Sequence, residues 1–99
     1  SNALTVVGAG MDEMVLSRFQ VWPNPAQDYF VLAFSLDEPT MLRISLIDLL
    51  GQEVRLLEEG LRAQGQHSLR YTTSGLVPGI YLLRTESPLQ VHLERLLVR

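Results

Sequence analysis

From Asp28 onward, apolar and polar residues alternate with a period of two. Phe30, Leu32 and Phe34 share one face of such a segment, and the residues between them share the other. A period of two is typical of half-buried β-strands, whereas an amphipathic helix would repeat about every 3.6 residues. The alternation therefore predicts strands and argues against a helical fold.

Turn signals interrupt the alternation about every 8–12 residues, which is the spacing typical of antiparallel sandwiches. After Gly51 a return strand is expected over 52–57, followed by a loop around Leu61 that Gly60 and Gly65 bracket. We predict an all-β fold, an immunoglobulin-like antiparallel β-sandwich of about seven strands. The segments that break the alternation are Asp37-Glu38-Pro39, Asp48-Leu49-Leu50-Gly51, Thr73-Ser74-Gly75-Leu76, Pro78-Gly79 and Ser87-Pro88.

Alternate positions of these strands are expected to form one core between two sheets. They share the period of two and large apolar or aromatic side chains. The expected core residues are Phe30, Leu32, Phe34, Leu42, Ile44, Leu46, Leu69, Leu76, Tyr81 and Leu83.

The 99 residues are enough for one domain. Residues 1–3, Ser-Asn-Ala, are interpreted as a scar from expression-tag removal and are excluded from the fold. Residues 4–17 are expected to be a linker or an added edge strand, with one or two helical turns over Met11–Leu16 as an alternative. The domain proper is expected to span residues 18–99.

Several classes of function are not supported by the sequence. The net charge is −3 without a basic stripe, so no nucleic-acid partner is expected. No apolar stretch reaches the roughly 20 residues of a membrane span. Cysteine is absent, and His67 and His92 lack companion ligands at metal-binding spacing, so neither a metal nor another cofactor is expected. No catalytic set of residues is recognised, and the chain is not expected to be an enzyme.

A proline-rich corner precedes the first regular alternation. Pro23 and Pro25 each fix φ and bias the preceding residue toward extended conformations. Asn24 can hydrogen-bond its own backbone two residues on and so turn the chain before Asp28. We interpret this segment as a structural corner in preference to a receptor contact.

Two further turns have defined chemistry. Asp48 is expected to cap a hairpin by accepting backbone N–H bonds, with Gly51 supplying a positive φ. Gly79 permits a backbone conformation that other residues resist, and Tyr81 is expected to bury its ring while its hydroxyl finds a partner. A catalytic or metal-binding role for Asp48 is disfavoured.

The chain carries, in order and over roughly residues 20–99, a set of motifs that resembles the C-terminal sorting domains of the type IX (Por) secretion system of Bacteroidetes. Each motif is weak alone, whereas the ordered set is fairly specific. Arginine stands at the terminal positions where this family usually has lysine. The motifs are Pro23-Asn24-Pro25-Ala26, Asp48-Leu49-Leu50-Gly51, Gly65-Gln66-His67, Ser74-Gly75-Leu76, Pro78-Gly79-Ile80-Tyr81 and Arg95-Leu96-Leu97-Val98-Arg99.

The resemblance implies a sorting signal that directs a larger cargo protein through the type IX outer-membrane translocon. The partners would be that translocon and a sortase-like peptidase that removes the domain during surface attachment. The domain would be found in the periplasm in transit, and then at the outer membrane, at the cell surface or outside the cell. The alternative is a non-catalytic adhesive or carbohydrate-binding β-sandwich. Such a module needs exposed aromatic side chains to stack on sugar rings, and only Trp22 and a few tyrosines and phenylalanines are available.

The resemblance also places translocon recognition at the end of the chain, in Arg95, Leu96, Val98 and Arg99. We expect the last strand to be an edge strand whose unpaired backbone groups a receptor can pair with. The competing interpretation of Arg95 and Arg99 is that they are solvated charges that discourage aggregation at the edge.

Overall fold

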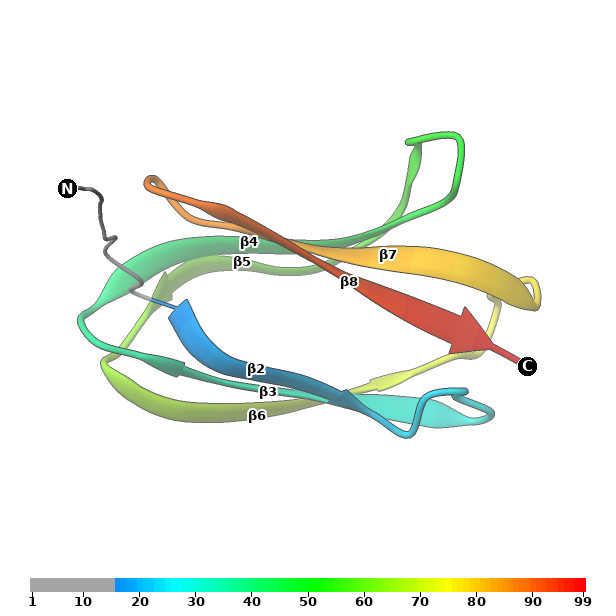
Figure 1. Ribbon diagram of the computed structural model, residues 1–99, viewed down its shortest axis with the longest axis horizontal. Helices are drawn as coiled ribbons and strands as arrows, with labels where there is room; N and C mark the ends of the chain where they lie inside the picture. The colour runs from blue at the N-terminus through cyan, green and yellow to red at the C-terminus, as the bar shows by residue number, and fades with distance from the viewer. Residues whose placement is uncertain (1–15) are drawn as a thin grey trace, which may run out of the picture.

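The computed structural model describes residues 16–99 and arranges them as two layers of antiparallel strands (Figure 1). The described part of the chain contains no helix, so the predicted all-β fold is confirmed. The strands are β2 (Leu16–Trp22), β3 (Tyr29–Leu36), β4 (Thr40–Ile47), β5 (Glu53–Arg62), β6 (Gly65–Thr72), β7 (Gly79–Glu86) and β8 (Val91–Val98).

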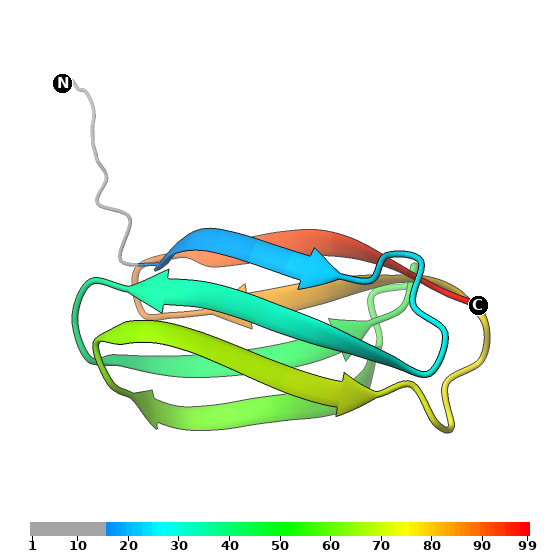
Figure 2. The ribbon, with the colours of Figure 1, turned by 90° about the horizontal axis from the view of Figure 1, so that it is seen from below.

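One sheet has the strand order β2-β3-β6 and the other has the order β5-β4-β7-β8. Figure 2 shows the first sheet lying over the second, with β2 and β8 along the same flank. Numbered in chain order, the first, second and fifth strands form one layer and the third, sixth and seventh the other, as in immunoglobulin domains. The fourth strand, β5, pairs with β4 and therefore joins the larger sheet.

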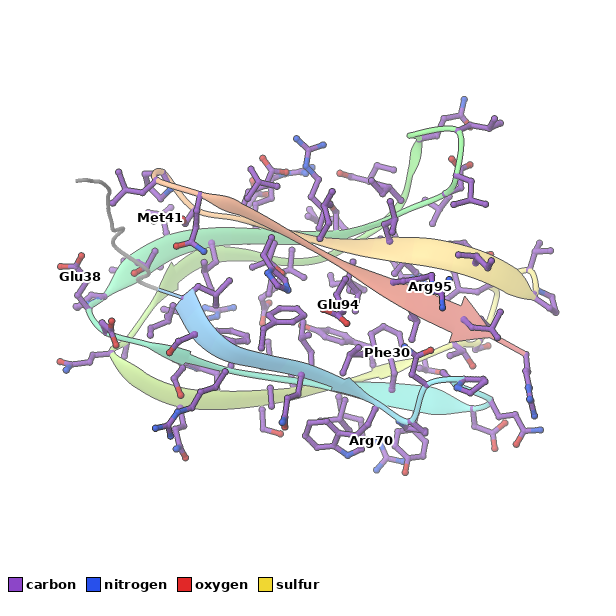
Figure 3. The ribbon with its side chains drawn as sticks, viewed as in Figure 1. Phe30, Glu38, Met41, Arg70, Glu94 and Arg95 are labelled. Carbon is purple, nitrogen blue, oxygen red and sulfur yellow. The ribbon has the colours of Figure 1, made fainter. Side chains whose placement is uncertain are left out.

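The core lies between the two sheets, and Figure 3 shows Phe30 in this layer. Eight of the ten expected core residues are buried, and Leu69 and Leu76 are partly buried against them. Burying a side chain of this size stabilises the fold by about 1.5–3 kcal/mol. The predicted core is confirmed, and Leu16, Ala26, Leu36, Leu96 and Val98 belong to it as well.

Strand β5 is longer than the sequence indicated. The expected loop around Leu61 is wrong, because β5 continues to Arg62 and the link to β6 is only residues 63–64. Gly60 lies opposite Leu42 in the ladder, and the register shifts between Ile44 and Ser45. A bulge of this kind absorbs an extra residue without ending a strand, so a turn-like Glu-Glu-Gly sequence can remain in the sheet.

Strand β2 begins at Leu16, within the segment for which a linker and an added edge strand were both considered. It forms the edge of its sheet beside β3. Its ladder is irregular between Ser17 and Gln20, and Arg18 has a φ of 55° there. This bulge masks the alternation over Leu16–Trp22. The expectations for residues 1–15 lie outside the described residues.

Candidate functional site: the clasped terminal strand

The proline-rich corner lies against the outer edge of β8. The Asn24 side chain donates from Nδ2 to the Arg95 carbonyl over 2.9 Å, and Oδ1 accepts the Leu97 N–H over 3.0 Å. A carboxamide has the same donor and acceptor groups as a peptide unit. Asn24 thus pairs with β8 as a strand residue would, but through its side chain.

Ala26 continues this pairing through its main chain. Its N–H donates to the Leu97 carbonyl over 2.7 Å, and its carbonyl accepts the Arg99 N–H over 2.8 Å. The two segments form a parallel bridge between Ala26 and Val98. Ala26 is fully buried, so a small side chain suits this position. We call residues 24–26 with residues 95–99 the clasp.

The clasp changes what the end of β8 offers to a partner. Four outward-facing backbone groups are already paired: the Arg95 carbonyl, both groups of Leu97 and the Arg99 N–H. The expectation of an unpaired backbone over residues 95–99 is therefore wrong, because the corner occupies that edge. Backbone pairing by a receptor would first require the corner to leave.

Side chains alternate across this strand. Leu96 and Val98 are 0 % and 3 % exposed and belong to the core. A partner of the folded domain cannot reach these side chains, so the predicted role of Leu96 and Val98 in recognition stays a prediction about their backbone or an opened form. Arg95 and Arg99 are exposed, and Figure 3 shows Arg95 projecting from β8.

A small groove adjoins Arg95. Pro25, Ile80 and Leu97 give it apolar walls, Asn24 and Arg95 give it polar ones, and its volume is about 280 Å³. Ile80 reaches it because Ile80 is the register partner of Leu97 in β7. The sequence did not suggest this groove, because its walls come from positions more than 50 residues apart that only the fold brings together.

The two turns have the predicted geometry. Asp48 Oδ1 accepts the N–H groups of Leu50 and Gln52 over 2.9 and 3.0 Å, and Gly51 has a φ of 86°. Tyr81 is 8 % exposed, and its hydroxyl donates to the Val77 carbonyl. Gly79 has a φ of 156°, in a region that side-chain-bearing residues rarely adopt. These residues hold β4, β5 and β7 in place behind the clasp.

Neither histidine contacts a residue of the clasp in the interactions that the structure shows. His67 stacks on Phe34 with a centroid distance of 5.3 Å, and its Nε2 lies 2.8 Å from the Ala63 carbonyl oxygen. His92 contacts the Phe19 ring, and its Nε2 lies 3.3 Å from Glu94 Oε1. Within residues 16–99 no group of three or more potential metal ligands converges.

Ion pairing concentrates on the outer face of the larger sheet. Arg43 Nη1 lies 2.7 Å from Glu53 Oε1, and Arg43 also pairs with Glu59 and Glu86. Hydrogen bonding to Glu53 raises the pKa of Arg43, and the same contact lowers the pKa of Glu53.

Elsewhere, burial raises the pKa of Tyr71 to about 12. In the described residues, no helix has the length and apolar character needed to cross a membrane.

This geometry defines a class of protein: a small β-sandwich module whose last strand is clasped by its entry corner and ends in exposed arginines. The sequence model of the secretion system C-terminal sorting domain matches residues 20–99, which is most of the chain. The chain belongs to this family of type IX (Por) sorting domains. No curated protein shows significant sequence similarity to the chain.

Family membership establishes the function at a coarse level. The domain is a sorting signal of type IX secretion, which implies interaction with the type IX machinery and export to the outer membrane, the cell surface or the extracellular space. The family is not known to be catalytic. An origin in Bacteroidetes is consistent with the family.

Proposed function

We propose that this domain directs a larger cargo protein through the type IX outer-membrane translocon and that the translocon recognises the side chains of Arg95 and Arg99. The observation that carries this proposal is the clasp. It pairs the outer backbone edge at the end of β8 while the two guanidinium groups remain exposed. A receptor can therefore bind the charges of the folded label without unpairing its strand.

The groove beside Arg95 supports a specific mode of recognition. Its apolar walls, Pro25, Ile80 and Leu97, adjoin a guanidinium that presents a planar fork of donors. A receptor segment with a carboxylate beside an apolar side chain would complement both features, since arginine pairs with carboxylates in a bidentate manner. Arg99 adds a second cation near the same end of the strand.

We further propose that the domain passes through the periplasm in its folded state and is removed by the sortase-like peptidase during surface attachment. Cleavage is expected within residues 4–17 or upstream of them. The family assignment supports this order of events, because domains of this kind are read by the translocon in the periplasm and are then usually removed by the peptidase. N-terminal sequencing of the released domain would locate the cut.

The test fuses the 99-residue chain behind a periplasmic reporter in cells that possess a type IX system. The parent fusion is expected to export the reporter. The double variant Arg95→Glu, Arg99→Glu is expected to retain the reporter in the periplasm, because it reverses the charge and preserves the strand. The matched control is Arg18→Glu, Arg70→Glu, which makes the same charge change on the opposite sheet and is expected to be exported.

Circular dichroism and thermal unfolding of each variant establish that it is folded before export is compared. Export of a folded Arg95→Glu, Arg99→Glu fusion at the parent level would refute recognition by the terminal charges. Retention of the parent fusion in the periplasm would refute the cargo-directing role of this chain. The adhesive or carbohydrate-binding module would then be the better proposal.

A further inference from the structure

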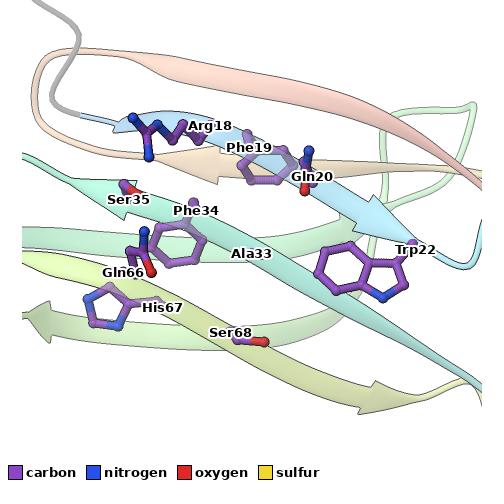
Figure 4. A pocket seen from close by; sticks show the side chains of 10 residues that line it. All are labelled: Arg18, Phe19, Gln20, Trp22, Ala33, Phe34, Ser35, Gln66, His67 and Ser68. Carbon is purple, nitrogen blue, oxygen red and sulfur yellow. The ribbon is translucent and has the colours of Figure 1, made fainter.

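A second surface lies on the opposite side of the sandwich, on the outer face of β2, β3 and β6. Figure 4 shows it as a shallow cavity between Arg18 at one end and Trp22 at the other. Its volume is about 660 Å³, and β2, β3 and β6 all contribute to its lining. It is separate from the clasp, whose groove is lined by other residues.

The cavity exists because its central side chains are small. Ala33 lies between Gln20 on β2 and Ser68 on β6, and Ser35 lies between Ser17 and Gln66. Longer side chains therefore surround a depression above Ala33 and Ser35. The backbone of β3 is paired on both sides, so over the centre of the cavity a ligand is recognised by side chains.

The lining carries a set of groups suited to sugars. Trp22 is 44 % exposed, and its ring offers the electron-rich face on which the C–H face of a pyranose can stack. Gln20 and Gln66 are exposed amides, each able to donate and accept hydrogen bonds as vicinal hydroxyls require. Arg18 and Trp22 stand at opposite ends of the cavity, so a short oligosaccharide lying in it can contact both.

The charge of this sheet differs from that of the chain. The chain has 11 acidic residues and a net charge of −3, yet β2, β3 and β6 contain no aspartate or glutamate. They contain Arg18, which lines the cavity, and Arg70, which lies outside the lining but on the same face, its guanidinium 3.8 Å from the centre of the Tyr29 ring. Planar guanidinium groups pair well with carboxylates. The surface therefore favours an anionic ligand.

We propose that the outer face of β2, β3 and β6 is a binding site for acidic oligosaccharides. Trp22 stacks on a sugar ring, Gln20 and Gln66 bind hydroxyl groups, and Arg18 and Arg70 pair with uronic-acid carboxylates. The site is independent of translocon recognition, so the domain would contact an acidic glycan while its other sheet presents the clasp. The two activities can be tested separately.

The test titrates the purified 99-residue chain with hexagalacturonate and follows indole fluorescence. Trp22 is the single tryptophan of the chain, so the signal reports directly on this site. Saturable binding of hexagalacturonate is expected, with no binding of neutral maltohexaose at the same concentrations. Arg18→Gln and Arg70→Gln should each weaken binding about tenfold, since each removes a charged hydrogen bond. The matched control Arg95→Gln should bind as the parent does.

Calorimetry adds a test of the stacking contact, because it does not depend on the fluorophore. Trp22→Phe, which keeps an aromatic face, is expected to retain most of the affinity, whereas Trp22→Ala should lose it. The proposal is overturned if hexagalacturonate does not bind, or if maltohexaose binds equally well. It is also overturned if the arginine variants bind unchanged, or if single-stranded DNA competes with equal affinity and reveals a general polyanion surface. None of these outcomes depends on whether the reporter fusion is exported.

Discussion

Asn24 illustrates how one residue can join distant parts of a sandwich. Its side-chain amide is bonded to Arg95 and Leu97, 71 and 73 positions away in the chain. The sequence predicted a rigid turn here from the flanking prolines, and local preferences support only that much. The partners of the Asn24 amide could not be predicted, because they depend on β8 returning to this corner.

Replacing Asn24 with alanine should loosen the end of β8. The variant loses two hydrogen bonds, each worth about 0.5–1.5 kcal/mol, and frees the Leu97 N–H. We expect lower stability in urea and faster hydrogen exchange at the Leu97 amide. Asn24→Asp is the comparison variant: its carboxylate still accepts the Leu97 N–H but loses the donor to the Arg95 carbonyl, so Leu97 should keep more protection than in Asn24→Ala. Unchanged exchange at Leu97 in Asn24→Ala would show that the amide does not hold the strand.

Gly51 offers a second test at the scale of one residue. Its φ of 86° is unfavourable for residues with a Cβ, although no heavy atom lies within 4 Å of an added Cβ. Gly51→Ala should therefore cost about 1 kcal/mol through conformation alone. Gly51→Asn should cost less, because asparagine tolerates this region. Chemical denaturation measures both, and equal losses would point to a cause other than the backbone angle.

At the scale of the elements, Arg43 links three neighbouring strands. It lies on β4 and pairs with Glu53 and Glu59 on β5 and with Glu86 on β7. These side chains are partly exposed, so the network makes a modest contribution to stability. Its value is to fix the positions of β5 and β7 on either side of β4, next to the ladder that β7 shares with β8.

This network predicts a dependence of stability on pH. The pKa of Glu53 is lowered below its ordinary value of 4.5, first by its hydrogen bond with Arg43. A lowered carboxylate pKa contributes stability above the pKa of the unfolded chain, and that contribution is lost as the pH falls through the folded-state pKa. The melting temperature should fall below about pH 4.5, and Glu53→Gln should reduce this acid sensitivity. Glu38→Gln, in an exposed turn, should leave it unchanged, and an identical response of both variants would contradict this role of the network.

The strands themselves were largely predictable, for reasons that differ along the chain. Where one face is buried and no bulge interrupts, as in β3, alternation alone locates the strand. Alternation fails for β2, where the bulge at Arg18 breaks the pattern. It also fails for the end of β5, where the residues around Gly60 are typical of a turn but stay paired with β4. The turn at Asp48 was predictable because its chemistry is local. The clasp, the groove beside Arg95 and the cavity on the outer face of β2, β3 and β6 are formed by residues that only the tertiary fold brings together. Local sequence does not specify these contacts.

At the scale of the whole molecule, the segment proposed as the recognition signal also contributes residues to the hydrophobic core. The exposed arginines proposed for recognition alternate with Leu96 and Val98, which are buried between the sheets. The clasp also fastens the entry corner onto this segment. The recognition charges therefore have a fixed position only when the sandwich is complete. An unfolded domain would present neither the charges nor the groove in the same geometry.

Deleting residues 95–99 should therefore unfold the domain instead of removing a tail. The deletion takes two buried side chains, each contributing about 1.5–3 kcal/mol, together with the backbone pairing of the clasp and of β7. Such losses approach the roughly 5–15 kcal/mol that holds a domain of this kind together. The truncated chain is expected to lose its β-sheet circular dichroism and its cooperative melting, whereas Arg95→Glu, Arg99→Glu should keep both.

A graded series separates stability from recognition. Leu96→Ala should lower the free energy of unfolding by about 2–5 kcal/mol, as large-to-small core changes do, and its export should fall only in proportion to the unfolded fraction. The charge-reversed variant should remain folded and lose export. If the truncated chain instead melts at the parent temperature, the terminal segment is not part of the core in solution. The loss of export by that truncation would then report on recognition alone.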